Sequence, residues 1–305
     1  MKSKVKSLNP DQFLEEFMVS GSKRDEIFKP DFGRFYIARM EDLRKISKPP
    51  VPPVRAETHT VLFLTKGVLI MKVGLTPVKA SKNECVIIPA GQVFSHAQEE
   101  DESAHGFICG FSNDFLIGLV GNSELLKRFE FLSVWGNPVL RPEEKIAEFL
   151  NQSFQRILYE YSQNGLENKL IIKSHLIAAL CDLNAIYQPL SNSKNHTAIE
   201  LANKFKELLH RNLRSKHKVS EYASMLCVSP NHLNKSVKLI TGKTPSEWIS
   251  ERLVIEAKIL LYQSGQSIGE IATEIGINDQ SYFSRLFKKH EGISPLAYRR
   301  TIESS

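Results

Sequence analysis

The sequence is poor in the features that mark secreted, zinc-binding and membrane proteins. It has only four cysteines, and no two of them form a Cys-x-x-Cys pair. Disulfide-rich folds and cysteine zinc sites both need closely spaced cysteines, so the chain is expected to hold neither. No apolar run approaches the length of a membrane span, and residues 1–30 lack the apolar core of a signal peptide. These absences favour a cytoplasmic protein with reduced thiols and no membrane partner.

What the chain has in excess is positive charge, and this excess is unevenly placed. The formal net charge is +6, and residues 196–305 account for +5 of it, with 16 Lys and Arg against 11 Asp and Glu. A basic final third is typical of a segment that contacts phosphate groups. A basic cluster without an acidic residue is formed by Arg211, Arg214, Lys216 and Lys218. The last three are candidate phosphate contacts, although a solvated loop would have the same composition.

Residues 219–248 and 268–298 are two imperfect copies of one pattern. Matching positions lie 49 residues apart in the first half of the pattern and 50 apart in the second. The matched pairs include Val219 with Ile268, Ala223 with Ala272, Leu233 with Phe283, Lys235 with Arg285, and Pro245 with Pro295. Two copies are too few to bury a stacked solenoid core, so each copy is expected to be a helix, a turn and a second helix. This is the plan of the helix-turn-helix motif.

Capping residues mark the expected helix ends. Gly276 follows the apolar stripe of the second copy, where a left-handed residue is needed to turn the chain. Cys227 stands at the equivalent turn of the first copy. Ser229 before Pro230 predicts a helix start. Further end signals are Gly242, Gly292, and the capping box of Thr244 with Glu247.

If the apolar stripe of each second helix is buried, its opposite face carries polar side chains. These are Asn231, Asn234 and Lys235 in the first copy, and Gln280, Ser281, Ser284 and Arg285 in the second. Asn and Gln pair bidentately with adenine, and Arg and Lys with guanine, in the major groove. The seven residues are therefore candidate contacts to double-stranded DNA, with a plain solvated face as the alternative. Residues 246–264 are expected to form one helix of about 27 Å between the copies.

The string SIGEIATEIGINDQSYFSRLFKKHEGISPLAYR closely resembles the DNA-binding domain of the AraC/XylS family of bacterial transcription regulators. The resemblance implies a seven-helix domain over residues 198–305, with base-contacting helices at 230–240 and 280–291. It also implies activation, a small-molecule effector, a homodimer and contact with RNA polymerase. Cys227 departs from the family pattern, because glycine often holds this turn.

Residues 31–111 change to short apolar or alternating runs, which predict the strands of a sandwich or barrel. The runs are FGRFYIARM, THTVLFLTKG, VLIMKVG, ECVIIPAG and HGFICGF. The segment ECVIIPAGQVFSH resembles the second motif of cupin barrels, and AraC-type effector domains are commonly cupins. Amphipathic helices are expected at 142–163 and 166–187. The predicted fold class is α+β and multidomain, with an N-terminal cupin-like β-barrel plus two helices and a C-terminal all-α domain with two helix-turn-helix motifs.

The chain is thus divided into an N-terminal arm (1–30), a cupin-like effector-binding and dimerisation domain (31–187), a linker (188–197) and the DNA-binding domain (198–305). A ligand is expected at the mouth of the barrel. The candidate pocket residues are Phe35, Arg55, Glu57, His59, Phe63, Phe94 and His96. Most of them would also suit an ordinary core. In the resembling family the two helices after the barrel make the dimer contact, and they could also simply cover the barrel.

The barrel lacks the His-x-His pair that a metal-binding cupin uses. Nothing in the spacing of His59, His96 and His105 brings them together as ligands. We therefore expect no metal, no cofactor and no enzymatic activity. A metal-dependent cupin enzyme fused to a DNA-binding domain is the weaker alternative. A DNA-repair methyl acceptor, which shares the helical domain, needs a zinc-bound cysteine cluster that the chain lacks.

The sequence therefore predicts a sequence-specific DNA-binding transcription regulator, ligand-responsive and an activator. The nearest alternative is a constitutive regulator whose barrel only dimerises. The two differ in whether a small molecule binds.

Overall fold

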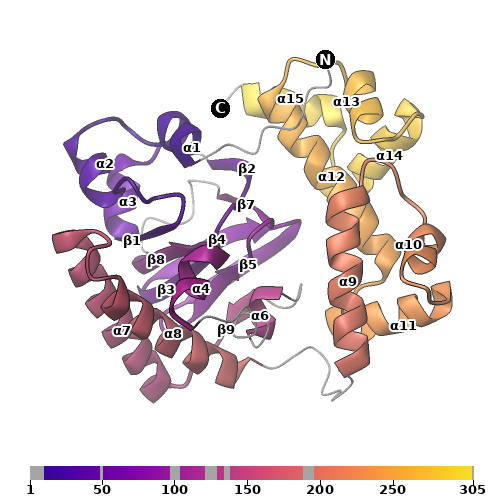
Figure 1. Ribbon diagram of the computed structural model, residues 1–305. Helices are drawn as coiled ribbons and strands as arrows, with labels where there is room; N and C mark the ends of the chain where they lie inside the picture. The colour runs from indigo at the N-terminus through magenta and orange to yellow at the C-terminus, as the bar shows by residue number, and fades with distance from the viewer. Residues whose placement is uncertain are drawn as a thin grey trace. The chain divides into compact units, whose positions relative to one another are not determined.

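The computed structural model describes residues 10–48, 51–96, 104–120, 129–133, 138–187 and 196–303 (Figure 1). They form two compact units, one within residues 10–187 and the other within 196–303. All the described strands lie in the first unit, and the described part of the second is helical. The predicted fold class, a β-sheet domain followed by a helical domain, is confirmed. The predicted linker, except for its last two positions, and the first nine residues of the predicted arm lie outside the described residues.

The first unit contains two antiparallel sheets. The larger has the strand order β1-β8-β3-β6-β9 and the smaller β2-β7-β4-β5. The strands of the larger sheet are β1 (Phe35–Arg39), β3 (His59–Lys66), β6 (Cys85–Ile88), β8 (His105–Phe111) and β9 (Val139–Leu140). Those of the smaller sheet are β2 (Val51–Arg55), β4 (Val68–Val73), β5 (Thr76–Ser81) and β7 (Val93–His96). Both edge strands of the smaller sheet, β2 and β5, contain proline, which a sheet edge tolerates.

Both faces of the larger sheet are buried. One face packs on α7 (Glu144–Asn164) and α8 (Lys169–Ile186), which lie across it (Figure 1). There the rings of Phe63 and Phe107 lie 5.9 and 5.7 Å from the ring of Phe154 on α7. The other face packs on the smaller sheet through a second core, with Leu62, Leu64, Val86 and Ile88 from one sheet and Leu69, Met71 and Val78 from the other.

Helices α7 and α8 match the two predicted amphipathic helices closely. Two large apolar side chains on these helices are nevertheless exposed: Phe149 at 43% and Leu170 at 66%. The stripe that faces the sheet on α7 is instead centred on Leu150, Phe154 and Ile157, all nearly inaccessible. Phe149 therefore lies beyond the edge of the buried stripe.

Short helices complete the first unit. They are α1 (Pro10–Phe17), α2 (Ser22–Ile27), α3 (Met40–Ile46), α4 (Asn113–Val120) and α6 (Glu130–Ser133). Met18, Phe28 and Ile46 form a small core that holds the first two helices beside β1. The ring of Phe32 packs on that of Tyr36 at 4.8 Å between centroids. This packing brings aromatic side chains from residues 10–32 to the margin of the larger sheet.

The second unit is built from seven helices within the described residues, as the family resemblance implies. They are α9 (His196–Asn212), α10 (Val219–Met225), α11 (Pro230–Thr241), α12 (Pro245–Gln263), α13 (Ile268–Glu274), α14 (Gln280–Glu291) and α15 (Pro295–Glu303). The second helix of each repeat begins at its predicted residue, 230 or 280. The connecting helix α12 contacts α11, α13, α14 and α15, and 13 of its 19 residues are buried. It therefore forms the core that the two repeats share.

Candidate nucleic-acid interface and ligand pocket

The turn inside each helix pair has one backbone geometry in both repeats. The Val228 amide donates a hydrogen bond to the Ala223 carbonyl at 3.0 Å, and the Ile277 amide donates to the Ala272 carbonyl at 2.8 Å. This pattern defines a helix end that needs a left-handed residue before the donor. That residue is Gly276 in the second repeat, with φ 89°, and Cys227 in the first, with φ 55°. Cys227 therefore holds a conformation that suits glycine better.

The outward helices α11 and α14 both start at a capping side chain. The predicted cap Ser229 accepts a hydrogen bond from the His232 amide at 3.2 Å. On α14 the cap is Asp279, which accepts from the Tyr282 and Ser281 amides at 3.0 and 2.8 Å. These bonds, chiefly the one from Tyr282, lower the pKa of the Asp279 carboxyl. This cap was not predicted from the sequence, although Asp279 stands 50 residues after Ser229, the offset of the repeat.

The seven candidate base contacts lie on the solvent side of these two helices. Asn231, Lys235, Gln280, Ser281 and Arg285 are exposed, and Asn234 and Ser284 are partly exposed. The opposite faces are buried through Leu233, Val237 and Ile240 on α11, and Phe283, Leu286 and Phe287 on α14. Within the described part of the chain, none of the seven side chains forms a hydrogen bond or an ion pair. Their polar atoms are therefore available to a partner.

Two more outward side chains occupy equivalent positions that the sequence analysis did not select. His232 on α11 is exposed, and Tyr282 on α14, 50 residues later, is 48% exposed. A large aromatic ring left in solvent beside polar residues is common at binding surfaces. The repeat offset itself was the signal that could have found this pair.

The three candidate phosphate contacts have different surroundings. Arg214 forms an ion pair with Glu274 on α13 at 2.7 Å, and Lys216 lies 3.5 Å from the Glu221 carboxylate. Lys218 is exposed, and its backbone amide donates to Glu221 at 2.9 Å. The cluster has no acid in its own sequence, but folding brings Glu221 and Glu274 to it. Of the three, Lys218 is the cation without an ion pair among the described residues.

A buried ion pair fixes the second outward helix to the central helix. Lys258 of α12 and Glu291 of α14 lie 2.9 Å apart, and their side chains are only 4% and 7% exposed. The Lys258 ammonium also lies 5.2 Å from the centroid of the Tyr298 ring. This contact ties the C-terminal end of α14 to the core of the unit.

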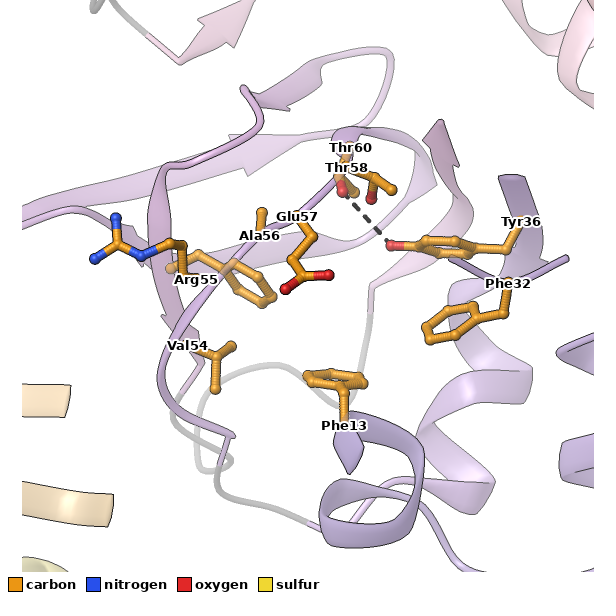
Figure 2. Close-up of a pocket in the computed structure, with 10 residues that line it drawn as sticks. Phe13, Phe32, Tyr36, Val54, Arg55, Ala56, Glu57, Thr58 and Thr60 are labelled. Atoms are coloured by element: carbon orange, nitrogen blue, oxygen red, sulfur yellow. Dashed lines mark hydrogen bonds between the residues drawn. The ribbon is translucent and has the colours of Figure 1, made fainter. Parts of the chain in front are cut away.

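In the first unit a small pocket opens between the N-terminal helices and the sheets (Figure 2). Its volume is about 70 Å³, and it is lined by Phe13, Phe32, Tyr36, Val54, Arg55, Ala56, Glu57, Thr58, Thr60 and Phe94. Tyr36 and Thr60 lie on either side of Gly110 in the strand register. A Cβ on Gly110 would overlap the Tyr36 ring, so this glycine lets the ring lie flat across β8. The Tyr36 hydroxyl then reaches the Thr60 hydroxyl at 3.5 Å.

Three of the seven predicted pocket residues line this cavity: Arg55, Glu57 and Phe94. Phe35 and Phe63 instead lie in the core between the larger sheet and the two helices. His59 is buried, with Nδ1 accepting from the Ala90 amide at 3.1 Å and Nε2 2.9 Å from Asn113 Oδ1. His96 on β7 does not line the cavity. Alternation along β1 and β3 could not separate the two faces of these strands, because both faces are apolar.

The three histidines considered as metal ligands do not form a cluster. Among the described residues, no group of three or more His, Cys, Asp or Glu side chains is placed to hold a metal ion. His59 already has partners for both ring nitrogens. No described helix is long and apolar enough to span a membrane.

Two protein-family descriptions match the two units. "AraC-like ligand binding domain" matches residues 50–180, and "Helix-turn-helix domain" matches residues 222–301. The uncharacterized HTH-type transcriptional regulator YisR of Bacillus subtilis is 26% identical over 264 residues, 81% of this chain and 90% of that protein. The MmsAB operon regulatory protein of Pseudomonas aeruginosa is 22% identical over 298 residues, 96% of this chain and 89% of that protein. The crystal structure of ToxT from Vibrio cholerae covers 88% of this chain and 98% of its own, at 14% identity and a TM-score of 0.44.

A ligand-binding β-domain followed by a paired helix-turn-helix domain defines a DNA-binding transcription regulator. The relatives that match over most of their length are named as regulators. The chain belongs to the AraC family of transcription regulators.

Proposed function

We propose that this protein is a ligand-responsive activator that inserts α11 and α14 into two successive major grooves of one DNA duplex. The observation that carries the proposal is the pair of equivalent outward faces, each with unpaired polar side chains at a capped helix start. The 19 residues of α12 rise about 28 Å. Adjacent groove faces are about 34 Å apart, so reading both requires some bending of the DNA.

The side chains on the two helices suggest what each would recognise. Asn231 and Asn234 on α11 suit adenine, and Lys235 suits guanine. On α14, Gln280 suits adenine and Arg285 suits guanine, while Ser281 and Ser284 suit either. Lys218 is the best candidate for a phosphate contact, because Arg214 and Lys216 already have carboxylate partners.

Arg285→Ala tests this assignment directly. We expect the substitution to weaken binding to the selected operator by about 1–3 kcal/mol and to relax the base preference at one position. Fluorescence anisotropy with DNA obtained by in vitro selection measures the affinity, and repeating the selection with the variant measures the preference. If affinity and preference both stay unchanged, α14 does not read bases as proposed.

Lys218→Ala tests the proposed phosphate contact. Lys204→Ala is its matched control, because it also removes one positive charge from the helical unit. Lys218→Ala should weaken all sequences alike and reduce the salt slope of binding by about 1. Lys204 lies on α9 and pairs with Glu200, so Lys204→Ala should leave DNA binding unchanged. A loss of sequence preference with Lys218→Ala would contradict its role as a phosphate contact.

For the rest of the chain we infer the division predicted from the sequence: an arm at 1–30, an effector-binding domain at 31–187, a linker at 188–197 and the DNA-binding domain at 198–305. Ligand in the pocket would shift the population between arrangements of the two domains and thereby change operator affinity. Activation through RNA polymerase is what membership of the family suggests. Without an effector, the same architecture would act as a constitutive regulator. We infer no catalysed reaction.

We also propose that the chain is a homodimer through α7 and α8. Phe149, Tyr159 and Leu170 leave large apolar side chains exposed on these helices, at 43%, 59% and 66%. Large apolar side chains left exposed on these two helices favour a protein contact. Sedimentation equilibrium should therefore give twice the 34.6 kDa mass of one chain. A single-chain mass at micromolar concentration would contradict the proposal.

A further inference from the structure

The pocket of the first unit combines aromatic rings with one inward carboxylate. Phe13, Phe32, Tyr36 and Phe94 supply the rings. Figure 2 shows the Glu57 carboxylate directed into the space between the labelled rings of Phe13 and Tyr36. An aromatic enclosure with a carboxylate is the arrangement that attracts organic cations, because ring faces and carboxylate oxygens both carry a negative electrostatic potential.

Arg55 is the other charged residue that lines the pocket, and its positive charge does not lie inside the pocket. The Arg55 side chain extends away from the space that Glu57 enters (Figure 2), and its Nη1 donates to the Gly91 carbonyl at 3.0 Å. Glu57 itself has no hydrogen bond or ion pair within the described residues. The carboxylate therefore gives the pocket interior a negative potential.

The remaining polar groups are poorly suited to an uncharged polar ligand. The Tyr36 hydroxyl is directed at the Thr60 hydroxyl (Figure 2), and Thr58 is only 8% exposed. Burial raises the pKa of Tyr36 to about 12, so its phenol stays neutral and adds no negative charge of its own. The Glu57 carboxylate would repel an anionic ligand, and a polyol would find few free hydrogen-bond donors in the pocket.

We propose that this pocket binds a small organic cation, an alkylammonium ion whose positive head contacts Glu57 and lies against the aromatic rings of Phe13 and Tyr36. The proposal rests on the function proposed above, since it names the ligand class of the same effector site. A volume of about 70 Å³ is roughly that of five to seven water sites, so the enclosed part of the ligand has few heavy atoms. A longer substituent would extend through the opening.

Three probes of one shape and different charge test the ligand class on the full chain. They are choline, its uncharged isostere 3,3-dimethylbutan-1-ol, and the anion 3,3-dimethylbutanoate, with tetramethylammonium and 1,4-diaminobutane as further cations. Isothermal titration calorimetry should detect at least one of the three cations. If choline is a cation that binds, its affinity should be at least about tenfold higher than that of the alcohol, a difference in binding free energy of about 1.4 kcal/mol. The butanoate should not bind.

Glu57→Gln and Glu148→Gln form a matched pair of variants. Both residues are exposed, so neither change should affect folding, which the melting temperature checks. Glu57→Gln should weaken cation binding at least about tenfold, and Glu148→Gln, on α7, should leave it unchanged. Cation binding that survives Glu57→Gln would overturn the proposal.

The failure of this inference can be distinguished from failure of the proposed function. If only uncharged or anionic compounds bind, the ligand class is wrong while the effector site stands. A second measurement, operator affinity in the presence of a broad metabolite set, addresses the function alone. If no compound of any charge binds or changes operator affinity, both proposals fall.

Discussion

Lys258→Ala is expected to destabilise the helical unit by about 3–5 kcal/mol, because it leaves the Glu291 carboxylate buried without its partner. The two side chains are 4% and 7% exposed and 2.9 Å apart, so little water can replace the lost ammonium. Hydrogen exchange of peptides from α12 and α14 along a urea titration measures the effect. Operator binding should fall with it, since Glu291 lies at the end of α14.

An exposed ion pair of the same unit provides the control for Lys258→Ala. Lys204 and Glu200 lie 2.7 Å apart on α9 with side chains 60% and 66% exposed. Lys204→Ala should therefore change the unfolding free energy by no more than about 0.5 kcal/mol. Equal effects of the two alanine substitutions would mean that the Lys258–Glu291 pair is not desolvated as described.

Gly276→Ala and Cys227→Gly should change the stability of the helical unit in opposite directions. A Cβ at Gly276 would overlap the Arg214 carbonyl oxygen, and φ is 89°, so we expect a loss of about 2–5 kcal/mol. At Cys227, φ is 55° and the side chain is exposed, so glycine relieves strain and gains roughly 0.5–1 kcal/mol. The hydrogen-exchange titration proposed for Lys258 measures both.

The contrast between the two turns is informative because their hydrogen bonds are alike. Cys227→Ala keeps a side chain at the same left-handed position and should leave stability nearly unchanged, which separates backbone strain from loss of the thiol. A stability loss with Cys227→Gly would show that the cysteine side chain makes a contribution of its own.

The sequence could predict the helical unit closely because its signals are local. Helix starts at residues 230 and 245 depend on capping side chains within three positions, and both predicted caps form. The acid partners of Arg214 and Lys216 were not predicted, because ion pairing there depends on how separate segments fold together.

The β-domain was predicted less well, for reasons that lie in its packing. A sheet covered on both faces carries apolar residues at odd and even positions, so the pattern of β3 could not say which side chains face the pocket. Tyr36 was not predicted as a pocket residue. The position of its ring depends on Gly110 of another strand, because a larger residue there would overlap the ring. Phe13 belongs to a segment of mixed polarity whose helix is held by the tertiary contacts of its aromatic residues.

The burial of α12 has a consequence for the operators that such a protein can use. A helix enclosed by its neighbours along most of its length cannot stretch or unwind to follow a change in its target. One extra base pair between the two contacted segments would move the second by about 3.4 Å and turn it by about 35° around the duplex axis. The protein would then lose its contacts with one of the two DNA segments or would have to twist the DNA. Target sites should therefore tolerate substitutions within either segment far better than insertions or deletions between them.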